Sequence, residues 1–169
     1  RVEAGRDLAV GPTVGLRPHF GARFAADPED PGVELVVLAD SASGVSVFNI
    51  YNGMNPTIMA QVDTPGTAES VGCSGTTVVV ADGSEGLAVI DVSDPPNAEI
   101  VTQIGFGFSA TVASIAGNYA FVGLSSGEIA AVDIATGTEV NRAAAGTNVH
   151  ALVVDGESLF ALVDNELRP

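Results

Sequence analysis

Short runs of β-branched and aliphatic residues alternate with Gly, Asp, Asn and Pro along most of the chain, and helical periodicity is absent. Runs of this kind, bounded by turn residues, are typical of strands joined by tight connections. Turns are expected at Ser74-Gly75, Asp82-Gly83 and Asp94-Pro95. Between them the pattern predicts four strands, at residues 69–73, 77–81, 87–92 and 99–104.

Several predicted strands are apolar at successive positions, as in VVVA at 78–81 and LAVI at 87–90. A strand that is apolar on both faces needs cover on both faces, and sheets stacked face to face provide it. The pattern therefore favours several small sheets that pack against one another.

The same pattern recurs along the chain at a constant offset of 42. GTTVVVADGSEGLAVIDV at 75–92 aligns without a gap on GNYAFVGLSSGEIAAVDI at 117–134, and VVLAD at 36–40 aligns on VVVAD at 78–82. A further copy, GESLFALVD at 156–164, aligns on residues 117–125 with an offset of 39. Units of about this length with four strands are typical of β-propeller blades. A β-sandwich with coincidental similarity is the alternative, and the gapless offset argues against it.

We therefore predict an all-β fold, a β-propeller of four-stranded antiparallel blades, in one domain or fragment. Its expected parts are an N-terminal strand segment (1–18), three blades (19–65, 66–107 and 108–146) and a partial fourth blade (147–169). The last copy is expected to end after its second strand, which leaves a sheet edge to cover. Either residues 6–14 supply an outer strand, or further sequence or another chain completes the propeller. We favour the second and expect the isolated chain to oligomerise or aggregate.

The charge limits the classes of partner. The chain has 21 acidic residues against six basic ones, a net charge of −15, and 46% apolar residues, which is ample for a core. Nucleic acid and anionic lipid surfaces would be repelled, whereas cations or a basic protein surface would be attracted. No apolar run approaches the length of a membrane span, so the chain is not expected to span a membrane. It begins with Arg1, which suggests processing or a fragment.

Acidic residues at equivalent hairpins are the first candidate site. Asp40, Asp82 and Glu85 lie in connections rich in Gly and Ser, where carboxylate oxygens would suit Ca²⁺. Asp and Gly are also the residues that a tight turn requires, and we favour the turn interpretation. Asp91 and Asp133 recur at one strand position, where a carboxylate accepts backbone hydrogen bonds from a turn.

Histidines and aromatic residues provide the other candidates. His19 and His150 stand at similar places in the first and last units, where a shared metal is conceivable, although solvated side chains are the better interpretation. Phe106 and Phe108 in a predicted linker, and Tyr51 and Met54 near another connection, are candidate partner-binding residues, with packing between blades as the alternative.

The second copy resembles a known family. VVVADGSEGLAVIDVSDPPNAEIV at 78–101 is similar to the LVIVD repeat of bacterial and archaeal β-propeller proteins. The other copies depart from it, with Asn52-Gly53 in place of the Asp-Pro turn in one of them. The resemblance implies the propeller fold and an exported, periplasmic or cell-surface protein, and it implies no catalytic residue.

Catalytic motifs are absent: the chain has no G-x-S-x-G, no H-E-x-x-H and no P-loop. We therefore expect a non-enzymatic protein-binding or assembly scaffold without a required cofactor, and we expect it to be a subunit of a larger complex. The alternative is a propeller hydrolase or metal-dependent enzyme with a site in the central channel.

Overall fold

Four small antiparallel sheets follow one another along the chain in a computed structural model that describes residues 22–26, 34–50, 56–156, 158–164 and 166–168. Apart from one short 3-10 turn, η1 (Pro95–Asn97), the regular structure in these residues is β-strand. The first sheet contains β1 (Ala22–Ala26), β2 (Glu34–Ala39), β3 (Val45–Asn49) and β4 (Thr57–Val62). The second contains β5 (Ser70–Ser74), β6 (Thr77–Ala81), β7 (Leu87–Asp91) and β8 (Glu99–Ile104). The third contains β9 (Ala110–Ala116), β10 (Tyr119–Leu124), β11 (Glu128–Asp133) and β12 (Thr138–Ala144). The fourth contains β13 (Val149–Asp155), β14 (Ser158–Val163) and β15 (Glu166–Arg168).

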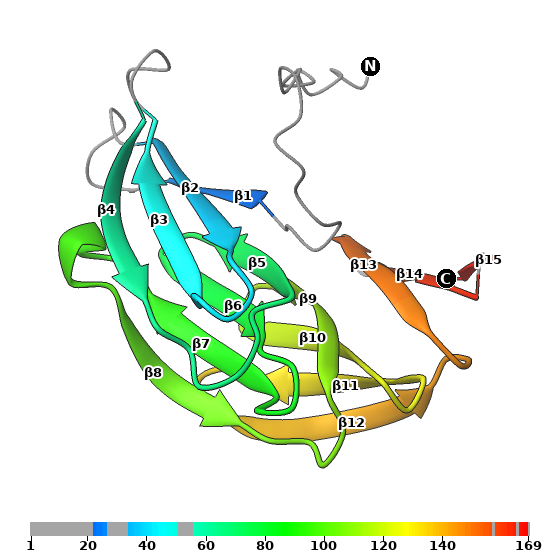
Figure 1. Ribbon diagram of the computed structural model, residues 1–169. Helices are drawn as coiled ribbons and strands as arrows, with labels where there is room; N and C mark the ends of the chain where they lie inside the picture. The colour runs from blue at the N-terminus through cyan, green and yellow to red at the C-terminus, as the bar shows by residue number, and fades with distance from the viewer. Residues whose placement is uncertain (1–21, 27–33, 51–55, 157, 165, 169) are drawn as a thin grey trace, which may run out of the picture.

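Within each sheet the strands follow one another in chain order and every pair is antiparallel. The sheets follow one another in an arc, with β5, β9 and β13 on its inner side and β4, β8 and β12 on its outer side (Figure 1). This is the arrangement of β-propeller blades, so the predicted all-β propeller fold is confirmed. The four strands predicted between residues 69 and 104 are confirmed as β5 to β8, to within one residue at their ends.

The fourth sheet has one strand more than the sequence indicated. The last unit was expected to end after its second strand, which is wrong, because β15 pairs with β14 through Leu167 opposite Leu162 and Glu166 opposite Val163. The segment that forms β15 is too short, and lacks the apolar pattern, to be predicted as a strand from the sequence. An existing edge supplies the pairing instead, because β14 offers free backbone groups directly after a tight turn.

The core lies between the sheets, as the two-faced apolar runs require. Val79 in β6 faces the third sheet, while its neighbours Val78 and Val80 face the first, and all three are fully buried. Because successive side chains of a strand point to opposite faces, one run fills two interfaces. The interface between the third and fourth sheets is smaller and includes Leu152 and Val163.

The hairpins between second and third strands approach the backbone of the outer strand closely. Gly86 has a φ of +90°, and a Cβ atom there would overlap the carbonyl oxygen of Ile104. Gly44 has a φ of +73° and the same relation to Val62. Both positions therefore need glycine, for the left-handed backbone and for the space.

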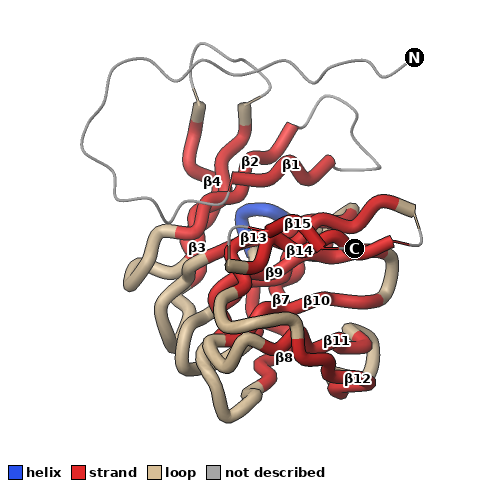
Figure 2. Tube along the Cα trace, turned by 90° about the vertical axis from the view of Figure 1, so that its right-hand side faces the viewer, coloured by secondary structure: helices blue, strands red, loops and turns tan. Residues whose placement is uncertain are grey.

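The arc is open in the described residues. The innermost strands β5, β9 and β13 pack side by side, and β1 packs on β5, but β1 and β13 are not packed against each other. Seen from the side, the first sheet is uppermost in the view, and β11 and β12 of the third sheet are lowest (Figure 2). Among these residues no helix has the length and apolar character needed to cross a membrane.

Candidate functional site

One side of the arc carries all the connections that bring successive sheets together, and we call it the loop face. It comprises the hairpins at residues 40–44, 82–86 and 124–127 and the linkers at 63–69, 105–109 and 145–148. Hairpins are hydrogen-bonded to linkers, as in Ala68 N to Ser41 O (2.9 Å) and Ala110 N to Gly83 O (2.8 Å). The constant spacing of the repeat therefore places equivalent loops side by side along this face.

A buried carboxylate holds the first linker. Asp82, directly after β6, is fully buried. It accepts hydrogen bonds from Thr64 Oγ1 at 2.7 Å, from Gly66 N at 3.0 Å and, more weakly, from Gln103 Nε2 at 3.4 Å. Thr64 is itself only 4% exposed. A buried carboxyl group is tolerated in such a site because hydrogen-bond donors surround it, so Asp82 acts as a latch between the linker and the second sheet.

The fourth sheet repeats this arrangement in solvent. Asp164, directly after β14, accepts hydrogen bonds from the hydroxyl and amide of Thr147 and from the amide of Asn148. The Thr147 hydroxyl is the main cause that lowers the pKa of the Asp164 carboxyl, and the two backbone donors add to it. Both carboxylates therefore restrain the linker that enters their own sheet.

The third unit has an apolar replacement for the latch. Leu124 occupies the place of Asp82 and is fully buried, next to Phe106 from the linker. The linker is bound to its hairpin by two hydrogen bonds, Ser125 N to Ser109 O at 2.8 Å and Ser109 N to Ser125 Oγ at 3.1 Å. Apolar contact and backbone pairing thus replace the carboxylate.

Arg142 on β12 fixes the other side of this linker. Its guanidinium lies 5.9 Å from the centroid of the Phe106 ring and donates from Nη2 to Phe106 O at 3.4 Å. It also pairs with Glu139 at 2.7 Å and with Glu128 at 3.5 Å. The hydrogen bond from Arg142 lowers the pKa of the Glu139 carboxyl, and the same contact raises the pKa of Arg142. Phe106, predicted as a partner-binding residue, is 8% exposed, so its ring is used in packing.

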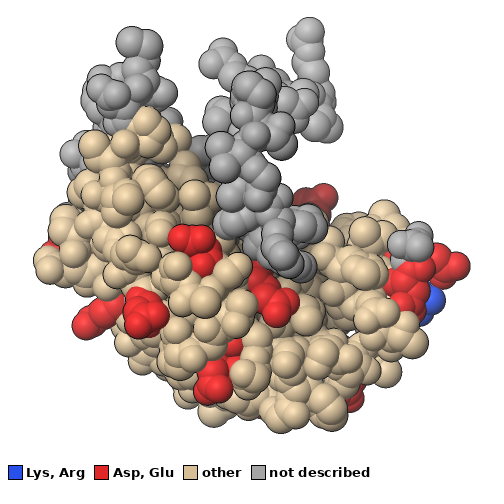
Figure 3. Space-filling view, viewed as in Figure 1, with Lys and Arg blue, Asp and Glu red and all other residues tan. Residues whose placement is uncertain are grey.

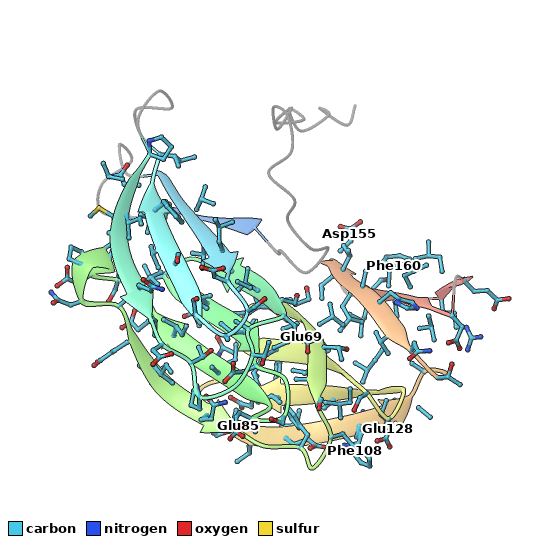
Figure 4. The ribbon with its side chains drawn as sticks, in the orientation of Figure 1. Glu69, Glu85, Phe108, Glu128, Asp155 and Phe160 are labelled. Carbon is cyan, nitrogen blue, oxygen red and sulfur yellow. The ribbon has the colours of Figure 1, made fainter. Side chains whose placement is uncertain are left out.

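Phe108, two residues along the same linker, has the opposite environment. Its side chain is 48% exposed. The linker runs between the hairpin that carries Glu85 and the hairpin that precedes Glu128, because Ala110 pairs with Gly83 and Ser109 with Ser125. Figure 4 shows Phe108 at the rim of the arc between Glu85 and Glu128. An exposed aromatic ring therefore stands among carboxylates on the loop face.

The loop face is acidic. Figure 3 shows several groups of Asp and Glu spread over the face turned toward the viewer, while Lys and Arg are visible only at one edge, by β15. Asp40, Asp63 and Glu85 on the loops are exposed. A surface of this kind attracts cations and basic protein surfaces through its summed field.

The predicted metal candidates that the structure describes do not form a group of metal ligands. Asp40 and Asp82 both close hairpins through backbone bonds, Asp40 N to Gly44 O at 2.8 Å and Asp82 N to Gly86 O at 2.7 Å, as the turn interpretation requires. His150 is exposed on β13, and His19, like Tyr51 and Met54, lies outside the described residues. In the part of the chain described, no three His, Cys, Asp or Glu side chains gather as metal ligands do.

Asp91 and Asp133 are turn residues, as the sequence predicted. The carboxylate of Asp91 accepts from Ser93 N at 2.9 Å. That of Asp133 accepts from Ala135 N at 2.9 Å and from Thr136 N at 3.3 Å. The expected backbone hydrogen bonds are thereby confirmed, and both carboxylates stabilise the connection to the outer strand.

A cavity of about 580 Å³ opens between the third and fourth sheets. Its walls are mainly apolar and include Phe121, Ile129 and Leu159, and Arg168 is a charged residue that also lines it. Sequence reasoning did not find it. The cavity lies beside the short third strand of the last sheet, where the second and third sheets each have a longer one.

Two units of the chain match a repeat family. The sequence profile of the LVIVD repeat matches residues 65–103 and 109–141, which contain most of the second and third sheets. The chain carries LVIVD repeats. The resemblance seen in the sequence at residues 78–101 is thereby confirmed and extends to the next unit. No curated protein matches the sequence.

Solved structures resemble this LVIVD-repeat chain in fold. The computationally designed protein Ika4 has a TM-score of 0.65 and 14% identity over 87% of this chain and 89% of its own. The computationally designed protein Ika8 has a TM-score of 0.63 and 15% identity over 83% of this chain and 41% of its own. Hydrazine synthase of Kuenenia stuttgartiensis has a TM-score of 0.65 and 17% identity over 95% of this chain and 46% of that chain. This chain thus spans less than half of the last two, and at these identities the likeness concerns the fold alone.

Proposed function

We propose that this chain is a non-enzymatic protein-binding or assembly module, a rigid propeller arc whose loop face receives a basic protein surface. The observation that supports the proposal is Phe108, an exposed ring between Glu85 and Glu128 on an acidic face. Aromatic residues in such positions supply binding energy by burial, while the surrounding charge steers a partner of opposite sign.

The scaffold beneath Phe108 is well suited to such a role. The ring stands on a linker whose neighbours are held by the Ser109–Ser125 pair and by Arg142 over Phe106. A restrained anchor loses little conformational entropy on binding. The family resemblance supports an exported, periplasmic or cell-surface setting, with the chain as a subunit of a larger complex. A partner of that kind would be a protein, because nucleic acid is repelled by the charge of −15.

The test is site-specific photo-crosslinking in native material. A benzophenone side chain at position 108 is expected to capture a defined protein, with capture reduced at least tenfold by Glu85→Lys combined with Glu128→Gln and weakened by salt. The matched control places the same group at Val101, which is 54% exposed on β8. Equal capture from both positions would contradict the proposal. So would a turnover that depends on residues of this chain.

A further inference from the structure

The two ends of the arc are complementary to each other. We call the side of each sheet that meets the following sheet its forward face, and the opposite side its backward face. In the first three sheets the forward face is covered: Val37 and Val79 are fully buried against the next sheet, and Phe121, which aligns with Val79 in the repeat, packs against the fourth. The forward face is therefore an interface in every unit that has a successor in the described residues.

The equivalent face of the fourth sheet is uncovered. Phe160 aligns with Phe121 in the repeat and is paired across the sheet with Val153, which is 51% exposed. Leu162 and Leu167 are paired on the same face and are 36% and 70% exposed. Figure 4 shows Phe160 at the open end of the arc, on the side turned away from β9 to β12. Four large apolar side chains on one small sheet form a patch of the kind that marks an interface.

The first sheet presents the missing counterpart. The backward faces of the second and third sheets are formed by equivalent residues, Val78 and Ile90 in one and Ala120 and Val132 in the other, all fully buried. In the first sheet the repeat aligns Val36 with Val78 and Phe48 with Ile90. Those side chains are only half buried, and no sheet is packed on them among the described residues. The chain therefore carries both halves of an interface that it already forms between its own sheets.

We propose that two copies of this chain close a ring, the forward face of the fourth sheet of each copy packing on the backward face of the first sheet of the other. A head-to-tail contact of this kind gives a closed ring when the rotation that relates one copy to the next leads back to the first copy. The proposed partner of the fourth sheet is a second copy, because the backward face of its first sheet is equivalent to the backward faces that the second and third sheets bury.

Sedimentation velocity on the 169-residue chain tests the stoichiometry. The expected species has twice the mass of 17.0 kDa. Val153→Asp is expected to weaken association at least tenfold, since it places a charge in the contact, while Val101→Asp, at 54% exposure on β8, leaves it unchanged. Circular dichroism checks that both variants keep their strands. A monomer at every concentration, or equal effects of the two variants, would overturn the proposal.

Disulfide trapping gives a second readout that does not rely on a destabilising charge. In a Cys73→Ser background, Leu162→Cys and Leu38→Cys place one thiol at each end of the arc, since Leu38 lies on the same backward face as Val36. Mixing the two single variants is expected to yield a disulfide-linked dimer, and the protein carrying both substitutions is expected to link between chains. An intrachain disulfide would show that a single chain closes on itself, which overturns the two-copy ring. This test is independent of the loop face, so it stands or fails separately from the proposed function.

Discussion

Removing the buried latch at Asp82 should cost a large share of the stability of the chain. In Asp82→Ala, Thr64 Oγ1 and Gly66 N lose their acceptor, while Gln103 keeps a hydrogen bond to Glu85 O at 2.9 Å. A hydrogen bond to a charged group contributes about 1.5–3 kcal/mol, and a buried donor left without a partner costs about 1–3 kcal/mol. Because two donors are affected and Asp82 is fully buried, we expect a loss of about 3–5 kcal/mol in the free energy of unfolding.

A double-mutant cycle separates the latch from general damage to the core. Thr64→Val keeps the shape of the side chain and removes only the hydroxyl donor, so it should cost about 1–2 kcal/mol alone. Combined with Asp82→Ala it should cost less than the sum, with a coupling energy of about 1–2 kcal/mol. The assay is urea unfolding followed by far-ultraviolet circular dichroism at one fixed protein concentration, since the chain contains no Trp. Additive single effects, within about 0.5 kcal/mol, would refute the argument that Thr64 and Asp82 act as one unit.

Asp164→Ala is the matched control for this prediction. Asp164 has the same kind of donors, a threonine hydroxyl and two backbone amides, but its side chain is exposed. Water replaces the lost carboxylate there, so the donors of Thr147 and Asn148 stay solvated. The loss of stability should therefore be clearly smaller than that of Asp82→Ala. A loss of equal size would show that burial does not decide the strength of the latch.

Three further predictions concern other parts of the chain. Gly86→Ala should destabilise by at least about 2 kcal/mol in urea unfolding, since φ is +90° and the new Cβ meets the carbonyl of Ile104, whereas Gly156→Ala, at φ +59° with open space, should cost only about 1 kcal/mol. An NMR titration of Asp164 should give a pKa below its ordinary 3.8, and Thr147→Val should raise the pKa of Asp164. Because the pKa is lower in the folded state, the ionised carboxylate stabilises the fold above pH 3.8, and this contribution disappears as the pH falls through the folded pKa. Arg142→Lys should speed amide exchange of residues 105–109 at least threefold by hydrogen-exchange mass spectrometry, because lysine cannot bind Glu139 and the Phe106 carbonyl together.

The fold could be predicted because the physical signals repeat. A strand that is apolar on both faces, such as β6, indicates a sheet packed between two others. The constant offset between copies indicates that each unit packs in the same way. Turn residues divided the second unit correctly since Gly75 has a φ of +57° and Asp91 caps its own turn. Residue types alone were sufficient to predict the local structure wherever a residue and its hydrogen-bond partner lie in the same turn.

Features that depend on distant partners escaped sequence reasoning. The hydroxyl that satisfies Asp82 belongs to Thr64, in the linker from the previous sheet, so the sequence showed only an aspartate before a glycine. Phe106 and Phe108 are alike in the sequence, and contacts with distant residues, the apolar cluster around Leu124 and Arg142 on β12, separate the packed ring from the exposed one. One indication of the latch was available: Asp82 and Asp164 each follow the second strand of a unit, and each has a threonine at nearly the same distance before it, Thr64 and Thr147.

The units differ in how they fasten the linker that enters each sheet. Repeat structures gain stability from each unit and from the contact between neighbours. The second and fourth sheets fasten their linkers with an aspartate, at Asp82 and Asp164, whereas the third uses Leu124, Phe106 and a serine pair. The linker at residues 105–109 is therefore fastened without a carboxylate, and the side chain of Phe108 in this linker is exposed. The fold thus holds its linkers with or without an aspartate, and under the proposed function the third unit, which has none, carries the exposed aromatic side chain of Phe108.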